Sequence, residues 1–414
     1  MRAMTLPAPR LDGSVKGWPD LGCLASELAP GQLSVDMLPT PALTVRSDLL
    51  DRNIATMAGW CAERGVLHAP HAKTTMAPEI LSRQLQAGSW GLTVADVRQA
   101  RIALACGARN LIIANELSSS VDVQWVADRT ADGAKGLAAA TRIVFCVDSL
   151  RGLEIAAEAR RRSDAPPLEV LIELGYKGGR CGPRSAREAL KIAEAIAACP
   201  DVRLAGVETY EGLLLPREDG RGAPCAVDEV LEHTAEVAVA AAPFIQSERP
   251  LLTAGGSSYF DRVVNVLTGP ATALGWELCL RSGCYATHDH GLYERLTPVT
   301  RDASAPRFLA AIGLRTRVLS RPEPGLAILD AGRRDVSYDA GLPVPIAPAR
   351  LAGLEVTALN DQHAYLRVPE DTPIEIGEVI SLGISHPCTT LERWRVFALV
   401  DGGGSVLGAA TTWF

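Results

Sequence analysis

A lysine that follows a short apolar segment is the residue of this sequence best suited to covalent chemistry. Lys73 lies in the segment 68–75, His-Ala-Pro-His-Ala-Lys-Thr-Thr, after residues 65–67 and before a predicted helix over 76–85. The order predicts a strand, then the lysine, then a helix. An amine at the end of a strand is partly removed from water and can attack a carbonyl carbon to form a Schiff base. The alternative is a solvated lysine in a loop, which is how most lysines occur.

Three further segments with glycine or polar residues also follow predicted strands. Arg180 lies in the glycine-rich segment 175–182, and Tyr210 lies in the segment 208–212. The third segment precedes a predicted helix and comprises Gly255, Gly256, Ser257 and Ser258. Backbone N–H groups at a glycine turn and at a helix N-terminus attract an anion, so this segment predicts a phosphate site. A simple turn is the alternative interpretation.

A histidine and a cysteine near the C-terminus have the spacing of a pair of metal ligands. His386 and Cys388 are separated by one residue, and on an extended strand both side chains would point to the same side. Imidazole and thiolate are good zinc ligands, and two protein ligands leave room for water and substrate. A buried thiol beside a surface histidine is the alternative. A second possible ligand cluster, His288 to His290, is interpreted as a loop.

The elements that must position these residues follow a strand–helix rhythm. The predicted strands are 42–45, 66–69, 90–94, 111–114, 142–147, 168–174, 202–207 and 251–254. Their near-continuous apolar character predicts a sheet that helices cover on both faces. Eight such units over residues 41–290 predict a closed (β/α)8 TIM-type barrel, whose chemistry lies at the C-terminal ends of the strands. A doubly wound sheet is the alternative, but no G-x-G-x-x-G follows an early strand.

The rest of the chain has a different pattern. Residues 309–414 contain β-type segments interrupted by glycine and proline, which predicts a C-terminal all-β domain. We therefore predict an N-terminal extension over 1–40, a barrel over 41–290 and a β domain over 291–414. The extension should pack on the β domain or on a partner chain.

Composition excludes several classes of function. A net charge of −7 at pH 7 disfavours nucleic acid or an anionic membrane as the main partner. No segment of 18 apolar residues and no secretory signal is present, so no membrane span is expected. Five of the 10 cysteines lie in apolar element patterns, namely Cys61, Cys106, Cys146, Cys199 and Cys279, as expected for a protein of the reducing cytoplasm.

Taken together, the motifs resemble the D-serine dehydratase and D-threonine aldolase family, which are pyridoxal-phosphate enzymes of the alanine-racemase fold type. The resemblance rests on Pro-His-Ala-Lys-Thr at 70–74, Arg-Cys-Gly at 180–182, Gly-Gly-Ser at 255–257 and His-x-Cys at 386–388. It extends from about residue 39 to the end of the chain. It implies a barrel with a C-terminal β domain, and a homodimer with its active site near the subunit interface.

The resemblance also implies roles for individual residues. Lys73 should hold pyridoxal 5'-phosphate covalently, and the loop 255–258 should bind the phosphate. His71, Arg180 and Tyr210 should border the cofactor. His386 and Cys388 should hold a divalent metal, with zinc the expected ion and manganese or magnesium as alternatives.

The expected activity is that of a D-serine dehydratase-like lyase. It would eliminate the β-hydroxyl of a small β-hydroxy-D-amino acid and give a 2-oxo acid and ammonia. Cysteine at 388 resembles the dehydratases, because the aldolase members tend to carry aspartate there. Retro-aldol cleavage of D-threonine type, amino-acid racemisation and non-enzymatic pyridoxal-phosphate binding are the alternatives. Residues 300–414 argue against the last, since such binding proteins lack the appended β domain.

Overall fold

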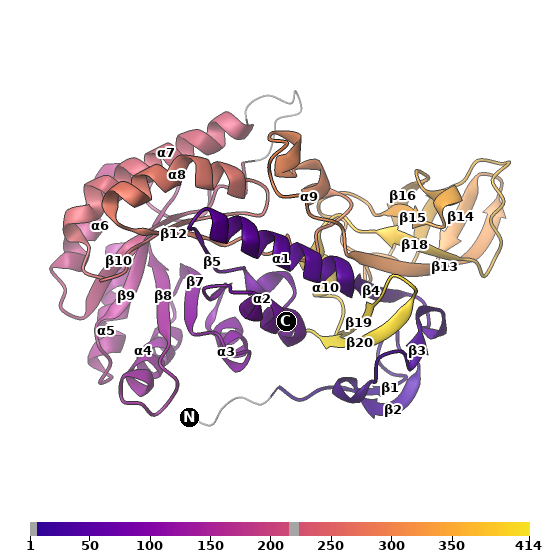
Figure 1. Ribbon diagram of the computed structural model, residues 1–414, viewed down its shortest axis with the longest axis horizontal. Helices are drawn as coiled ribbons and strands as arrows, with labels where there is room; N and C mark the ends of the chain where they lie inside the picture. Colours follow the sequence, from indigo (N-terminus) through magenta and orange to yellow (C-terminus); the bar gives the residue numbers. More distant parts are fainter. Residues whose placement is uncertain (1–5, 215–222) are drawn as a thin grey trace. The chain divides into compact units, whose positions relative to one another are not determined.

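The computed structural model describes residues 6–214 and 223–414, which form two units (Figure 1). Residues 58–72 and 84–283 make up the first unit. Residues 6–57, 73–83 and 284–414 make up the second. The predicted site residues are therefore divided between two bodies, and each body is described by itself.

The first unit is a barrel of parallel strands. Their order in the sheet is β5-β12-β11-β10-β9-β8-β7-β6. Their bounds are Leu67–His68 (β5), Leu92–Val94 (β6), Asn110–Glu116 (β7), Arg142–Val147 (β8), Leu168–Leu174 (β9), Val202–Thr209 (β10), Leu251–Ala254 (β11) and Glu277–Leu280 (β12). A parallel bridge between His71 and Thr93 joins the two ends of this sheet, and Trp90 N donates to His68 O at 2.8 Å. The predicted (β/α)8 TIM-type barrel is confirmed.

Helices follow the barrel strands and surround them (Figure 1). These helices include α3 (Val97–Ala105), α4 (Ser120–Ala134), α5 (Leu150–Arg161), α6 (Ala186–Ala197), α7 (Ala223–Ala241) and α8 (Phe260–Leu274). Helix α1 (Ser47–Glu63) instead follows a strand of the second unit and belongs in part to each unit. Side chains fix where four of the barrel helices begin, because each accepts a hydrogen bond from a backbone N–H in the first turn. These capping residues are Asp96, Ser119, Ser149 and Ser185. Strongly specified helix starts keep the loops at the C-terminal ends of the strands in place.

One layer of side chains inside the barrel is entirely apolar. One inward-facing residue from each of several strands packs into a fully buried cluster; they are Ala69, Ile112, Val144, Leu171, Ala205, Leu251 and Cys279. Since side chains alternate along a strand, the next inward positions lie two residues closer to the C-terminal ends. This register decides which side chains face the interior at the mouth of the barrel.

One predicted barrel strand was wrong. The segment Ala42–Arg46 (β4) lies in the second unit, where it pairs with Ile312–Glu323 (β13) and with Val396–Val400 (β19). The eighth barrel strand is instead β12, which follows the last predicted strand, 251–254, and lies before the predicted start of the β domain at residue 291. A short apolar segment before a helix is compatible with either sheet, because its own sequence does not specify its neighbours.

The second unit is built on a ten-stranded sheet with the path β16-β17-β14-β13-β4-β19-β20-β3. Off this path, β18 pairs with β13, and β15 pairs with β18. The strands not yet bounded are Leu33–Ser34 (β3), Leu326–Leu329 (β14), Val344–Ala347 (β15), Glu355–Leu359 (β16), Ala364–Arg367 (β17), Val379–Gly383 (β18) and Ser405–Thr411 (β20). A hairpin of Arg10–Asp12 (β1) and Asp20–Leu24 (β2) precedes them. The predicted C-terminal β-rich domain is confirmed.

The N-terminal segment is part of this second unit. Leu11, Trp18 and Leu28 are buried in one cluster with Val396 and Val406 of the sheet. Apolar burial of this kind is the main favourable term in folding, so the segment contributes to the core of the β unit. The N-terminal segment was expected to pack on the β domain or on a partner chain, and the structure shows it packed on the β domain.

Within residues 6–214 and 223–414, no helix has both the length and the apolar character needed to cross a membrane.

Candidate active site

Lys73 lies directly after the first barrel strand. Strand β5 ends at His68, the chain makes a 3-10 turn over Ala72–Thr74, and helix α2 (Pro78–Gln86) follows. The predicted order of strand, lysine and helix is therefore present. Lys73 is half-buried and its neighbours Ala72 and Thr74 are buried. The predicted residue His71 belongs to the barrel, where its N–H donates to Arg281 O at 3.1 Å.

The segment after Lys73 is held by the end of the chain. Met76 is fully buried with a φ of 43°, a left-handed conformation that costs a side-chain-bearing residue about 1–2 kcal/mol. Trp413 N donates to Met76 O at 3.0 Å, and Thr411 N donates to Glu79 Oε2 at 3.2 Å. Such a conformation persists only where the surroundings fix it. The C-terminal residues supply that constraint within the second unit.

His386 is held in an orientation suited to metal binding. Its Nδ1 lies 2.7 Å from Asp339 Oδ2, and the hydroxyl of Thr389 donates to Asp339 Oδ1 at 2.8 Å. A carboxylate accepts the proton on Nδ1, which leaves Nε2 with a lone pair. Histidine ligands of metals almost always donate their other N–H to such a partner. No pattern in the sequence pointed to Asp339, which lies 47 residues from His386.

The prediction of a strand at His386 and Cys388 was wrong. Strand β18 ends at Gly383, and Cys388 lies in the first turn of helix α10 (Pro387–Leu391), with His386 as the residue before that helix. The reason is Pro387, because proline at the first helical position has the backbone angle that a helix needs. The alternation of side chains along a strand therefore does not apply here.

Cys388 has a partner that the sequence analysis missed. Its sulfur lies 3.4 Å from that of Cys284, and the hydroxyl of Thr74 lies 3.6 Å from each sulfur. The hydrogen bond with Cys388 lowers the pKa of Cys284 to about 6, and it raises the pKa of Cys388 together with burial. The pair of thiols therefore loses one proton readily and holds the second one firmly between the two sulfurs. Cys284 follows the eighth barrel strand, so recognition of that strand would have drawn attention to it.

The segment His288 to His290 forms a buried loop, as interpreted. Asp289 Oδ1 accepts hydrogen bonds from Gly291 N at 2.9 Å and Tyr293 N at 3.0 Å. These bonds fix the start of the short helix α9 (Leu292–Arg295). Burial raises the pKa of Asp289 to about 7 and lowers the pKa of His288 to about 4. These hydrogen bonds account for Asp289 Oδ1, while Asp289 Oδ2 is buried without a hydrogen-bond partner.

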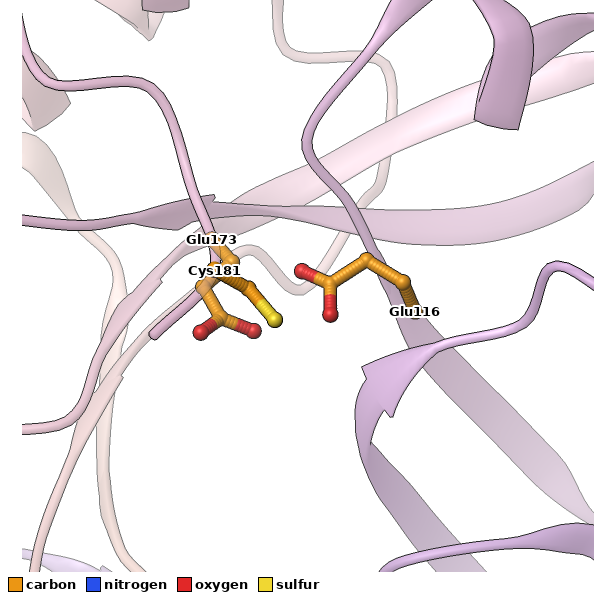
Figure 2. Close-up of side chains that lie close together, drawn as sticks. All are labelled: Glu116, Glu173 and Cys181. Atoms are coloured by element: carbon orange, nitrogen blue, oxygen red, sulfur yellow. The ribbon is translucent and has the colours of Figure 1, made fainter. Parts of the chain in front are cut away.

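A charged layer lies above the apolar layer in the barrel. Cys146, Glu173 and Arg281 follow apolar members of the cluster by two positions, and Glu116 pairs with Cys146 on the neighbouring strand after a register shift. Glu208 forms a salt bridge with Arg281, whose guanidinium also donates to Thr209 O at 2.8 Å. Figure 2 shows Glu116 facing Glu173 and Cys181, whose candidate ligand atoms lie within 4.8 Å of one another.

Protonation of Glu173 reduces the repulsion among the carboxylates of this charged layer. Burial, with the nearby carboxylates of Glu208 and Glu116, raises the pKa of Glu173 to about 10. Like-charged carboxylates in close contact cannot all ionise, so Glu173 carries a proton at neutral pH. Sequence analysis missed Arg281 because the last barrel strand was predicted at residues 251–254, and no strand was predicted over 277–280.

The predicted phosphate loop follows β11, as expected. Gly255 has a φ of 138°, and a Cβ there would lie 3.0 Å from Arg281 N, so the position requires glycine. Gly256 N donates to Glu211 Oε1 at 2.7 Å, and Gly283 N donates to Ser257 Oγ at 3.2 Å. The loop thus already presents an amide to an oxyanion, which fits a phosphate site. The donor set also has a competitor in Glu211, which is fully buried and whose pKa is raised by burial.

Arg180 and Tyr210 lie together, as expected for two residues that border one ligand. The Arg180 guanidinium lies 4.5 Å from the centre of the Tyr210 ring, a distance typical of a cation–π contact. Arg184 fixes the loop that carries Arg180, because its guanidinium donates to Cys181 O at 2.6 Å and Gly182 O at 2.7 Å. Ser258 is buried within the phosphate loop.

Comparison with known proteins assigns the family. Residues 45–243 match the family model of the alanine racemase N-terminal domain, and residues 311–400 match that of a putative serine dehydratase domain. D-threonine aldolase of Arthrobacter sp. is 28% identical over 373 residues, which cover 88% of this chain and 89% of that protein. The chain belongs to the D-serine dehydratase and D-threonine aldolase family. This is a family of pyridoxal-phosphate-dependent lyases that act on D-amino acids.

Other relatives within the family differ in their named activities. D-threo-3-hydroxyaspartate dehydratase of Delftia sp. (strain HT23) is 25% identical over 393 residues, with 89% of this chain and 96% of that protein covered. The crystal structure of D-threonine aldolase from Filomicrobium marinum has a TM-score of 0.77 and 27% identity, covering 92% of this chain and 98% of that chain. The fold and family are therefore those expected from the motifs, while both dehydratases and aldolases occur among the relatives.

Proposed function

We propose that this protein is a pyridoxal-phosphate- and metal-dependent dehydratase of a β-hydroxy-D-amino acid of the D-serine type. The products would be a 2-oxo acid and ammonia. The observation that carries the proposal is the pair of candidate ligands His386, oriented by Asp339, and Cys388. A thiolate at this position is the dehydratase-like form of the family.

The chain offers groups for each part of the cofactor. We assign the covalent bond to Lys73 and the phosphate to the loop 255–258, whose remaining donors include Ser257 and Ser258. Arg180 and Tyr210 would border the ring, and His71 would lie beside it. Pyridoxal phosphate, when bound, accepts the electrons that are released when a proton leaves the α-carbon. The Lys73 amine, once released by the substrate, is the base that we assign to that proton.

The metal site has a matching donor set. Imidazole nitrogen and thiolate sulfur favour zinc, whereas manganese and magnesium favour oxygen donors. In this role His386 and Cys388 would hold the ion, and Asp339 would keep the imidazole in the correct tautomer. A divalent ion supplies Lewis acidity, which helps a hydroxyl leave as hydroxide. A solved structure of the same fold is the metal-free form of a cysteine-to-alanine variant of D-threo-3-hydroxyaspartate dehydratase.

Retro-aldol cleavage is the second candidate. It is favoured by the relatives themselves, which include the D-threonine aldolase and a 3-hydroxy-D-aspartate aldolase from Paracoccus denitrificans (strain Pd 1222) at 25% identity. The same metal would then bind the substrate hydroxyl while its proton is removed. Racemisation needs no metal, so chelation separates it from both lyase activities.

One assay distinguishes these activities. Purified enzyme is incubated with D-serine, D-threonine, D-threo-3-hydroxyaspartate and L-serine, with and without a chelator. Dehydration gives a 2-oxo acid and ammonia, retro-aldol cleavage gives glycine and an aldehyde, and racemisation gives the enantiomer. We expect a 2-oxo acid from D-serine that a chelator abolishes. Glycine as the main product, or full activity in the presence of chelator, would overturn the proposal.

We further propose a homodimer in the cytoplasm. None of the nine cysteines whose side chains the structure describes forms a disulfide, which supports a reducing compartment.

A further inference from the structure

We infer that Cys284 is a third protein ligand of the metal that His386 and Cys388 are proposed to bind, which makes a Cys2His site. The inference rests on the metal dependence proposed above. Three protein ligands and one open position are the usual composition of a catalytic zinc site. It would place a second thiolate next to the position where substrate binds.

The distance between the two sulfurs supports a shared ion. Cys284 Sγ and Cys388 Sγ lie 3.4 Å apart. Two thiolates at 2.3 Å from one tetrahedral zinc are separated by about 3.8 Å, so the pair would open by only a few tenths of an ångström. Cys284 is 4% exposed, and both cysteines belong to the same unit of the protein.

The surroundings hold both sulfurs in position. His288 N donates to Cys284 O at 2.8 Å, and helix α10 holds Cys388. The Thr74 hydroxyl, 3.6 Å from each sulfur, can donate to one of them after the thiols lose their protons. Thr74 follows Lys73 in the chain. The sulfur pair therefore contacts the segment that carries the reactive amine, where a Lewis acid has to act.

The imidazole must move to complete the site. Among the described residues, the ligand atoms of Cys284, His386 and Cys388 do not yet form a group within 4.8 Å. Metal binding is therefore expected to draw Nε2 of His386 toward the sulfurs. Without metal, the same short sulfur–sulfur distance is explained by a hydrogen bond between a thiol and a thiolate, so the test must count sulfurs on a bound ion.

The test uses cobalt and zinc as probes on the full-length enzyme. Chelator-treated wild type is reloaded with Co²⁺, and the sulfur-to-cobalt charge-transfer absorption is compared among C284S, C388S and the control C199S. Cys199 lies in a loop after α6 and is not one of the candidate ligands. We expect about half of the wild-type intensity in each of the first two variants and full intensity in C199S. Zinc affinity in C284S should fall by at least about tenfold, as expected from loss of a direct ligand.

A measurement on the unaltered enzyme covers the case in which a variant fails to fold. X-ray absorption at the zinc edge of wild type should give two sulfur neighbours per ion. One sulfur neighbour, or full cobalt absorption in C284S with none in C388S, would show that Cys284 is no ligand while the proposed metal site stands. Absence of any stoichiometric metal in wild type would instead overturn the metal dependence itself.

Discussion

The carboxyl group of Glu211 accepts a hydrogen bond from a backbone N–H that would otherwise be able to donate to a phosphate. Gly256 N donates to Glu211 Oε1, and both residues are buried in the barrel unit. We expect E211Q to bind pyridoxal phosphate about 3- to 10-fold more tightly, because a neutral amide removes the repulsion between two anions. Burial raises the pKa of Glu211 above its usual range, so the difference should grow as the pH rises and the carboxyl ionises. Titration of the apoenzyme with cofactor measures it.

The exposed residue Glu229 provides the control, and E229Q should bind cofactor as wild type does. Weaker binding by E211Q at every pH would contradict the expectation. It would mean that Glu211 holds the loop 255–258 in shape rather than competing for its donors.

Lys73 should be the site of covalent attachment of the cofactor. We expect K73A to lose the visible absorbance of covalently bound cofactor and all turnover, whereas K191A, on the exposed face of α6, should keep both. Borohydride reduction followed by peptide mapping locates the modified lysine. An adduct on a different lysine would disprove the assignment.

At the residue scale, local context decided what the sequence could predict. Lys73 lies between a strand and a helix that are its neighbours in the chain, so its position followed from the pattern. Asp339 and Cys284 could not be predicted, because they meet His386 and Cys388 across 47 and 104 residues of sequence. No short pattern encodes contacts between such distant segments.

Strand β5 contains a histidine that should make the protein sensitive to acid. His68 is 5% exposed, its Nε2 lies 3.0 Å from Ser282 O, and burial lowers its pKa to about 4. The unfolded chain, with an ordinary pKa of about 6.5, binds more protons between pH 4 and 6.5. Stability therefore falls as the pH falls through this window, by about 3 kcal/mol in total.

Variants of two histidines test this. H68Q should be less stable than wild type at pH 7, because it disturbs the bond to Ser282, but it should lose about 3 kcal/mol less between pH 7 and pH 4. H363Q, at an exposed position, should parallel wild type. Urea unfolding at each pH supplies the free energies. Parallel curves for H68Q and wild type would rule out His68 as the origin of acid sensitivity.

Asp339 orients His386, the residue before helix α10, for the proposed binding of a metal. We expect D339N to lower zinc affinity by about 10–100-fold, because the amide no longer accepts the Nδ1 proton as strongly. The exposed variant D361N should retain wild-type affinity. Competition with a chromophoric chelator gives both constants. Unchanged affinity in D339N would exclude His386 Nε2 as a ligand held by this carboxylate.

At the element scale, strand positions were predicted better than strand partners. Seven predicted strands correspond to β5 through β11, because buried parallel strands are continuous apolar segments. Strand β4 has the same appearance and lies in the other sheet. Pro387 likewise changed an expected strand into a helix start. Pairing depends on contacts between distant segments, which apolar patterns do not specify.

At the scale of the whole molecule, we predict a homodimer. Enzymes with a barrel and an appended β domain of this family build each active site from two subunits, so dilution should reduce activity. Sedimentation velocity should give twice the mass of the chain at micromolar concentration. Full specific activity in a sample that sediments as a monomer would refute this.

The hydrogen bonds from Trp413 and Thr411 have a consequence for the timing of protein synthesis. Thr411 is 332 residues from its partner Glu79. At about 5–20 residues per second, the ribosome adds the C-terminal residues tens of seconds after the segment that carries Lys73. The nascent chain therefore exposes this lysine before Met76 is fixed in its left-handed conformation. The turn that carries Lys73 can reach its final conformation only after residue 413 has left the ribosome. Incomplete chains would therefore not bind pyridoxal phosphate at this turn.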